Sequence, residues 1–389
     1  MPTPSRLSRH LSQLILSALL AVPCGAVLAD PVYAVTVIGG AGSSAAGING
    51  AGDVVGQFTS GGNTHAFVVA DGGFADLGTL GGLNSAANAI NDSGQVVGWA
   101  NDGDGRSRAF LFSSGTMADL GTLGGANSTA TGINNQGIVV GSASSSLDGD
   151  PYYQHAFSYA NGTMRNLGTL NDGLGSDAWA INGNGMIVGA SFEGELTVPE
   201  YPHHAVMFGN GGVTEIAPLI DGVVHGVNDL DQMVGRMNFR NWHALLYADG
   251  AVQDLGVLDA SLDVSVAYDI NNLGQVVGAA GVQLGEFLWG YHGFLYSGAG
   301  ALTDLNTLID PAGGWEIISA GAINDAAQIA ATACRDGDCF AVRLDLVSPV
   351  PEPASWAMLG AGLALLTVHI RRPQRRPQQR LRRRAGAVA

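Results

Sequence analysis

The stretch Gly47-Ile48-Asn49-Gly50-Ala51-Gly52-Asp53-Val54-Val55-Gly56 carries the pattern that decides the fold. An apolar residue and an asparagine are followed, seven residues after the asparagine, by a glycine that ends a second apolar run. Successive Ile or Val positions lie 42, 43, 48, 46, 43 and 53 residues apart, and a period in the low forties is typical of a propeller blade. The further copies are Ala89–Gly98, Gly132–Gly141, Ala180–Gly189, Gly226–Gly235, Asp269–Gly278 and the degenerate Ala322–Ala331.

Each repeat divides into four short β segments. In the first copy they are Ala45–Asn49, Asp53–Phe58, His65–Ala70 and Phe74–Leu80, separated by Gly, Asn and Asp residues that favour turns. Within the segments the apolar residues alternate or form short runs, as strands require. The repeat therefore predicts an all-β fold over residues 30–348, a seven-bladed β-propeller of four-stranded blades.

The two ends of the repeated region complement each other. The seventh copy has three segments, ending in Phe340–Leu346, and no fourth. Val35–Gly40, before the first copy, matches the phrase that fills fourth segments elsewhere. We expect this N-terminal strand to complete the last blade and close the ring, which removes two exposed sheet edges. An open β-solenoid is the alternative, but such a stack needs polar caps instead of a shared blade.

Two phrases inside the blades resemble a known extracellular repeat. The third segment reads His-Ala-Phe at 65–67 and 155–157, and the fourth reads Asp-Leu-Gly-Thr-Leu at 76–80 and 119–123. These phrases resemble the HAF repeat over about residues 34–345, and the resemblance implies an extracellular protein without defining an activity. The recurrent histidines occupy one strand position in different blades, so we expect structural roles for them, each imidazole bonding a neighbouring loop. They are His65, His155, His204, His243 and His292.

The N-terminus has the features of a secretory signal peptide, residues 1–29. Arg6 and Arg9 precede an apolar run from Leu14 to Val22 that is too short to cross a bilayer. Small residues stand three and one positions before Asp30. We therefore expect a signal helix, export by the Sec route and cleavage after Ala29.

The C-terminus combines three parts in order: Pro351-Glu352-Pro353, the apolar stretch Ala354–Ile370, and a run of arginines from Arg371. An apolar helix that ends in arginines is typical of a stop-transfer segment, so a transmembrane helix is expected at 354–370. This order resembles the PEP-CTERM sorting signal, here 349–379. The resemblance implies transient anchoring in the inner membrane and processing by an exosortase, which releases the protein to the cell surface or the extracellular space. The basic tail 380–389 is longer than this family usually carries.

Charge and cysteine content restrict the partners. Residues 30–348 hold seven arginines against 32 acidic residues, a net charge of −25, and the chain has no lysine. Such a body repels nucleic acid, so no nucleic-acid partner is expected. Cys334 and Cys339 flank a short Arg-Asp-Gly-Asp turn, which predicts a disulfide in an oxidising compartment. No set of Cys and His residues suggests a metal site, and we expect no cofactor.

Loop length points to one functional face. The first turn of each repeat is constant, whereas the second-to-third connection varies from 8 to 15 residues and the fourth-to-first connection varies over the same range. In an up-and-down blade these two connections emerge on the same face, and variable loops carry recognition. Aromatic rings beside carboxylates suit sugars. The candidate ligand-binding residues in these loops are Tyr152, Tyr153, Glu193, Glu195, Tyr201, Glu286, Trp289, Tyr291 and Trp315.

The sequence thus predicts an exported binding module for extracellular carbohydrate, such as an exopolysaccharide, or for a matrix protein. No Ser/His/Asp or Cys/His arrangement indicates a catalytic residue, so we expect no enzyme. Two alternatives stay open. One is a carbohydrate-active hydrolase or lyase that uses paired acids of the long loops. The other is a passive structural protein of the cell surface.

Overall fold

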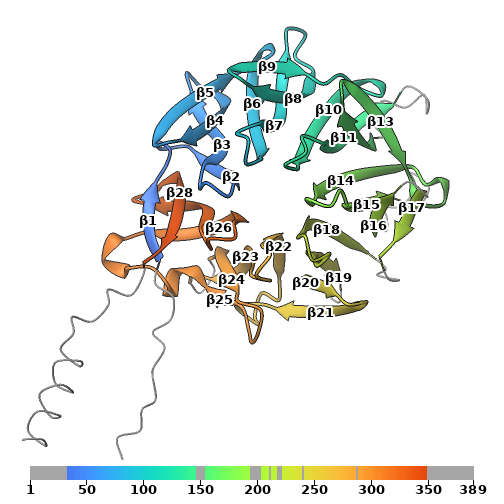
Figure 1. Cartoon of the computed structure of the whole chain (residues 1–389). Coiled ribbons are helices and arrows are strands. Elements are labelled where there is room, and N and C mark those ends of the chain that lie inside the picture. Colours follow the sequence, from blue (N-terminus) through green and yellow to red (C-terminus); the bar gives the residue numbers. More distant parts are fainter. Residues whose placement is uncertain are drawn as a thin grey trace, which may run out of the picture. The chain divides into compact units, whose positions relative to one another are not determined.

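The structure is a computed structural model that describes residues 33–347, apart from 146–153, 193–202, 210–211, 217–220, 239–240 and 286–287. The described residues form seven antiparallel sheets of four strands each, and each sheet is one blade of a ring (Figure 1). In every blade the strand that lies nearest the centre carries the Ile-Asn or Val-Asn phrase. The predicted seven-bladed propeller is therefore confirmed.

The first three blades follow the order of the repeat, and the strands of blade 1 begin and end within one to two residues of the expected segments. Blade 1 contains β2 (Ser44–Ile48), β3 (Val54–Ser60), β4 (Asn63–Ala70) and β5 (Gly73–Gly78). Blade 2 contains β6 (Gly81–Ile90), β7 (Val96–Asp102), β8 (Ser107–Ser113) and β9 (Thr116–Asp119). Blade 3 contains β10 (Gly124–Ile133), β11 (Val139–Ser145), β12 (Gln154–Ala160) and β13 (Thr163–Gly168).

The next three blades repeat this order, and short 3-10 helices interrupt some connections. Blade 4 contains β14 (Gly175–Ile181), β15 (Ile187–Phe192), β16 (His203–Gly209) and β17 (Gly212–Glu215). Blade 5 contains β18 (Gly222–Val227), β19 (Met233–Asn238), β20 (Trp242–Ala248) and β21 (Ala251–Gly256). Blade 6 contains β22 (Ser265–Ile270), β23 (Val276–Gln283), β24 (Trp289–Tyr296) and β25 (Thr303–Asp304). The 3-10 helices are η2 (Leu170–Asp172), η3 (Leu305–Thr307) and η4 (Pro311–Gly313).

The last blade is built from both ends of the repeated region, as expected. It contains β26 (Glu316–Ile323), β27 (Ile329–Arg335) and β28 (Asp338–Leu346), and β1 (Tyr33–Val37) is its outermost strand. β1 runs antiparallel to β28, with Val35 opposite Leu344 (Figure 1). Tyr33 is 2% exposed and belongs to the core of this blade. The ring is therefore closed, and the open solenoid is wrong.

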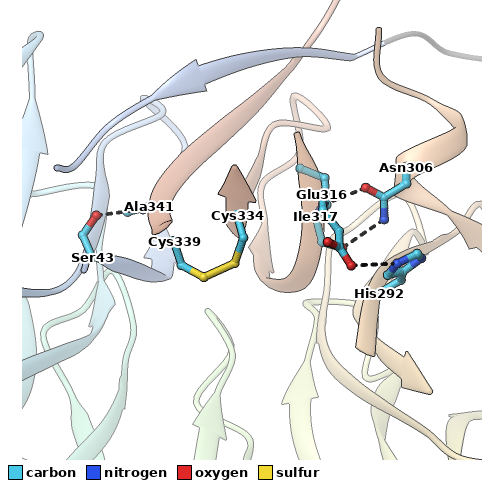
Figure 2. Close-up of a disulfide and its surroundings, with 8 residues drawn as sticks. All are labelled: Ser43, His292, Asn306, Glu316, Ile317, Cys334, Cys339 and Ala341. Atoms are coloured by element: carbon cyan, nitrogen blue, oxygen red, sulfur yellow. Dashed lines mark hydrogen bonds and ion pairs between the residues drawn. A yellow bond between two sulfur atoms is a disulfide. The ribbon is translucent and has the colours of Figure 1, made fainter. Parts of the chain in front are cut away.

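Two further contacts hold the closing blade in place (Figure 2). The Ser43 hydroxyl, just before blade 1, accepts the backbone N–H of Ala341 on β28 at 2.8 Å. Equivalent serines, such as Ser85 and Ser128, accept an N–H of the preceding blade in the same way. A disulfide joins Cys334 of β27 to Cys339 of β28 across their turn. The last blade is thus tied to the first by the same kind of hydrogen bond that joins other neighbouring blades.

The repeated asparagine forms a closed ring of hydrogen bonds through all seven blades. Each Nδ2 donates to the backbone carbonyl of the equivalent asparagine in the next blade at 2.9–3.2 Å. The last link runs from Asn324 back to Asn49. Each Oδ1 also accepts the backbone N–H four residues later, which shapes the first turn. The asparagines are turn formers, as expected, and they also connect the blades. Their exposed fractions are only 3–7%.

The closing glycine of the repeat permits a β-bulge in the innermost strand. In blade 1, Ala45 pairs with Gly56 and Gly47 pairs with Val55, so Ala46 is the extra residue. A Cβ at Gly56 would lie 2.0 Å from the carbonyl oxygen of Ser44, a distance that no side chain tolerates. Five other closing glycines show the same approach at 1.9–2.0 Å. In these six blades the close approach therefore requires glycine, and the bulge re-aims the extra residue. The last blade has the same bulge with Ala331 at the closing position, and a second register shift, between Ile317 and Ser319, lies in its innermost strand.

The hydrophobic core lies between adjacent blades. Val55 and Ala66 of blade 1, for example, pack with Val96 and Phe110 of blade 2, all of them fully buried. The phenylalanine of each His-Ala-Phe phrase faces inward, and Phe67 and Phe157 are also 0% exposed. Each blade thus buries its faces against two neighbours, and closure of the ring gives the first and last blades a shared core as well.

The repeated histidines all bond the fourth strand of their own blade, and one of them also bonds a neighbouring loop, as expected. The Nδ1 atom of each bonds an acidic or amide side chain on that strand, and His243 Nε2 bonds Asp263, in the loop that leads to blade 6, at 2.9 Å. His65 bonds Asp76 at 2.8 Å and His292 bonds Asp304 at 2.7 Å. The sequence spacing of 11 or 12 residues between the partners brings them together because the third and fourth strands form a hairpin. The role is structural, as predicted.

The predicted signal helix, the sorting signal with Pro351, Glu352 and Pro353, and the helix 354–370 lie outside the described residues. Within the part of the chain that the structure describes, no helix has the length and apolar character needed to span a membrane. Both helices therefore stay predictions.

The asparagine ring makes a direct prediction about stability. Asn134→Ala removes a buried donor and leaves the Asn182 carbonyl without its partner, so we expect a loss of about 1–3 kcal/mol in the free energy of unfolding. Asn135→Ala is the matched control, because the neighbouring Asn135 is exposed and bonds only the exposed Asp92. Urea unfolding followed by tryptophan fluorescence measures both. Equal losses in the two variants would contradict a special role for the ring.

Candidate binding cavity

The bulge places one residue of every blade at the centre of the ring. Register shifts in the innermost strands leave an extra residue in each blade, and all seven of these residues line one cavity of about 1130 Å³. The surrounding repeat is nearly constant, yet this position differs in every copy. The seven residues are Ala46, Asn88, Thr131, Trp179, His225, Tyr268 and Gly321.

Sequence reasoning missed this site, although a signal was present. The bulge residue always stands two positions before the Ile or Val of the repeat, for example Trp179 before Ile181. A position that differs in every copy of the repeat, between two nearly constant positions, indicates a role other than packing. The sequence analysis did not use this signal, because the direction of the side chain depends on the bulge. The period-2 alternation of a strand does not show where a bulge lies.

Three of the bulge side chains are engaged with the next blade. Asn88 Nδ2 donates to the Ala130 carbonyl at 2.7 Å, and Thr131 Oγ1 donates to the Ala178 carbonyl at 2.7 Å. His225 Nδ1 donates to the Ala267 carbonyl at 3.0 Å. Each acceptor is the carbonyl of the residue directly before the bulge residue of the next blade. These side chains therefore form a polar belt within the cavity wall.

Trp179 and Tyr268 are the accessible aromatic residues among the seven bulge residues, 39% and 37% exposed. His225 lies between them in the ring order and contacts both. Its ring meets Trp179 edge to face, with centroids 5.4 Å apart, and meets Tyr268 at a tilt, with centroids 6.1 Å apart. Blades 4, 5 and 6 thus present a continuous aromatic wall on one side of the cavity.

The mouth of the cavity reaches the face with variable loops. Ser107, Gln154 and His203 line it, and they are the first residues of β8, β12 and β16. Each follows a second-to-third connection of its blade, the connection whose length varies in the sequence. The lining of the cavity therefore extends to the face that carries the variable loops.

Burial controls the charge of the titratable groups along the wall. Burial lowers the pKa of His225 to about 4, so this imidazole is neutral near pH 7. Burial raises the pKa of Asp177 and raises that of Asp269 to about 6. The Asp269 carboxylate accepts the backbone N–H groups of Ile323 and Ile270, both at 2.9 Å, and so it is already used in joining blades.

Two neighbouring side chains affect the pKa of Tyr268. Burial raises the pKa of its phenol, the nearby Arg236 charge opposes that shift, and Tyr291 adds to it. Tyr291 was one of the candidate residues from the sequence, and its ring packs against that of Trp289 at 6.1 Å. Both side chains are solvent-exposed, 43% and 63% respectively. They connect the loop face of blade 6 with the aromatic wall.

The other candidates from the sequence fall elsewhere. Trp315 packs edge to face on Phe340 with centroids 5.5 Å apart, and the Arg335 guanidinium covers its ring at 4.0 Å. It therefore contributes to the core of blade 7. Among the residues with described positions, no group of three or more His, Cys, Asp or Glu side chains is arranged to hold a metal ion. The remaining candidates, Tyr152, Tyr153, Glu193, Glu195, Tyr201 and Glu286, lie outside the described residues.

Comparison with protein families identifies the C-terminal segment. Residues 349–372 match the PEP-CTERM protein-sorting motif. The motif implies an exported protein that is sorted by an exosortase, so this part of the sequence prediction is confirmed. The match leaves the repeated region untouched, and the HAF resemblance stays a prediction. No curated protein sequence matches the chain.

Solved structures resemble the ring. The β-propeller domain of the Trilobed protease from Pyrococcus furiosus is 7% identical in sequence, with a TM-score of 0.51 over 82% of this chain and 99% of that domain. Its open velcro topology contrasts with the closure by β1 and β28 here. TolB from Acinetobacter baumannii is 14% identical, with a TM-score of 0.38 over 54% of this chain and 51% of that protein. The chain thus spans about half the length of TolB. The likeness to the Trilobed protease domain shows the propeller fold alone.

The wall histidine and a hairpin histidine predict opposite pH effects on stability. Burial lowers the pKa of His225 to about 4, so its contribution to the free energy of unfolding is fully present above pH 6.5. This contribution, about 3 kcal/mol at most, is lost as the pH falls toward 4. The bond to Asp304 raises the pKa of His292, so its contribution is present below pH 6.5 and lost as pH rises through the folded pKa. We expect His225→Gln to destabilise most near pH 7 and His292→Gln most near pH 5. Urea unfolding across this range measures both, and parallel pH profiles would refute the assignment.

Proposed function

We propose that this protein is an exported surface or matrix protein that binds extracellular carbohydrate at the loop face, with the central cavity as its binding site. The observation that carries the proposal is the aromatic wall. Trp179 and Tyr268 are the accessible members of a seven-fold position at which other blades place small or hydrogen-bonded side chains. Exposed indole and phenol rings cover the apolar C–H faces of sugars while their polar edges stay hydrogen-bonded.

Polar groups around the wall complete a sugar site. Ser142 and Gln154 line the cavity next to each other, 2.8 Å apart through Oγ and Oε1. Amide and hydroxyl groups of this kind both donate and accept, so they match sugar hydroxyls without adding charge. A pocket with a few convergent polar groups and an aromatic lining is the usual form of a small-ligand site.

We favour binding over catalysis. The buried acids of the cavity are engaged, since Asp269 accepts two backbone N–H groups and Asp177 is neighboured by Ser142 and His203. Paired carboxylates that face each other across an open site, as glycoside hydrolysis needs, are absent from the described cavity lining, which contains Asp177 and Asp269 as its acids. A passive structural role would leave the exposed aromatic wall without a ligand, and the enclosed position of this wall in a cavity suits a sugar better than a protein surface.

Export and sorting supply the location for this activity. The PEP-CTERM match supports export. We further propose that the segment 354–370 anchors the chain transiently in the inner membrane, and that an exosortase-type enzyme then processes the tail. The propeller would thereby reach the cell surface or the extracellular space, where polysaccharide is available.

Carbohydrate binding is testable at the wall. We expect Trp179→Ala to weaken binding to a glycan, identified first on an array with purified protein, by about tenfold or more, because a stacked aromatic residue is a typical hot spot. Leu230→Ala is the control, since Leu230 is 65% exposed in a first turn on the opposite face. Calorimetry gives the affinities. Release of reducing ends from the bound glycan would instead favour the enzyme, and absence of any glycan binding would refute the proposal.

Sorting is testable in the cell. Replacing Pro351, Glu352 and Pro353 by alanine should leave the protein unprocessed in the membrane fraction, because the motif read by the exosortase is lost. Blotting of membrane and culture fractions with an antibody against the propeller measures the distribution. Arg165→Gln, on the outermost strand of blade 3, is the control and should be processed normally. Normal release of the triple variant would contradict exosortase sorting.

A further inference from the structure

One charged group at the cavity has no opposite charge beside it. Arg236, on β19, lines the cavity and approaches the aromatic wall closely enough that its charge acts on both His225 and Tyr268. Its guanidinium lies over the Trp242 ring, with Cζ 4.5 Å from the centroid. Among the described residues no carboxylate forms an ion pair with it, whereas Arg106, Arg108 and Arg343 each have such a partner.

The burial of its Nε atom distinguishes Arg236 from the other arginines without an ion pair. Residues 30–348 contain 32 acids and seven arginines, and within the described part of the chain Arg165 and Arg335 also have no carboxylate partner. Moreover, Arg236 Nε is buried and has no hydrogen-bond partner among the residues that the structure describes. A buried charged donor without an acceptor is costly, and such groups are typically completed by a ligand or a bound water.

We propose that Arg236 binds the carboxylate of an acidic sugar, so that the carbohydrate taken by the cavity is a uronic-acid-containing chain. The proposal rests on the proposed function and names its ligand class. A guanidinium offers two parallel N–H groups that match the two oxygens of a carboxylate, and stacking on Trp242 holds the guanidinium plane in place. Tyr268 and Trp179 supply the aromatic faces for the sugar ring itself.

The other charges at the cavity are consistent with an anionic ligand. His225 is neutral because burial lowers its pKa, Asp269 is occupied by backbone N–H groups, and burial raises the pKa of Asp177. Arg236 is thus the cation of the wall that is free to meet an anion. The negative body repels a long polyanion at a distance, so a short oligosaccharide tests the local contact best.

The test compares one sugar with and without its charge. The probes are α-1,4-linked digalacturonate and its dimethyl ester, measured by calorimetry on the mature protein. We expect the wild type to bind the acid about 10- to 100-fold more tightly than the ester, as a charge-assisted hydrogen bond implies. Arg236→Gln should lose this preference and keep ester binding, which also shows that the site is folded. Arg236→Lys should keep part of the preference.

Arg165→Gln is the matched control, because it removes the same charge from an exposed position on β13 and should change nothing. Equal wild-type affinity for acid and ester, or an acid preference that survives in Arg236→Gln, would overturn the inference and leave carbohydrate binding intact. Binding of neither probe, with binding of neutral glycans on an array, would overturn it in the same way. Absence of all glycan binding would overturn both proposals. If Arg236→Gln does not fold, the wild-type ratio and Arg236→Lys decide.

Discussion

The closed circle of asparagine side chains is the interaction on which the rest of the structure depends. A propeller blade contacts only its two neighbours, so its position relative to the whole ring has to be set at each interface. The side-chain amide of each asparagine contributes to this positioning through both its oxygen and its nitrogen. Its oxygen shapes the first turn of its own blade, and its nitrogen bonds the backbone of the next blade at the equivalent asparagine. Because these groups are buried, a missing partner would be costly, and the register between blades is therefore well defined.

A second constraint follows from the bulge beside this ring. The carbonyl that precedes the bulge comes so close to the second strand that only glycine fits opposite it, as at Gly56 and Gly189. The backbone of the innermost strands is thus nearly identical around the ring. The bulge side chain is freed from packing by this same geometry. A regular scaffold with one variable position per blade allows a specific site to form without disturbing the fold.

The site gains its character by departing from the symmetry of the repeat. Blades 4 to 6 place Trp179, His225 and Tyr268 at the bulge position, whereas blades 1 and 7 place Ala46 and Gly321. Large rings on one side and small residues on the other leave a cavity with an aromatic wall instead of a filled channel. The guanidinium of Arg236, which has no ion pair among the described residues, lies at this wall inside an acidic molecule. The aromatic rings and the positive charge therefore lie on the same side of the cavity.

The fold was accessible from the sequence because its determinants are local and repeated. The spacing of the asparagine and glycine gave seven blades, and the incomplete last copy showed that β1 has to complete it, since an unpaired edge is unfavourable. The C-terminal sorting motif was readable for the same reason, as three parts in a short contiguous order. The His–acid pairs were only partly predictable, because a hairpin brings residues 11 positions apart into contact and the sequence does not show which residue each histidine bonds.

The binding cavity required the tertiary structure. Its bulge residues, such as Asn88, Trp179 and Tyr268, come one from each blade, and no stretch of sequence contains two bulge positions less than 42 residues apart. Which side chains face the centre depends on a bulge that alternation does not reveal, and which charges are unpaired depends on distances between blades. The sequence by itself determined the ring, its closure and the face with variable loops, because these follow from local hydrogen bonding and strand order. Only the folded ring decided where aromatic and cationic groups converge, because that convergence is a property of the centre that all seven blades share.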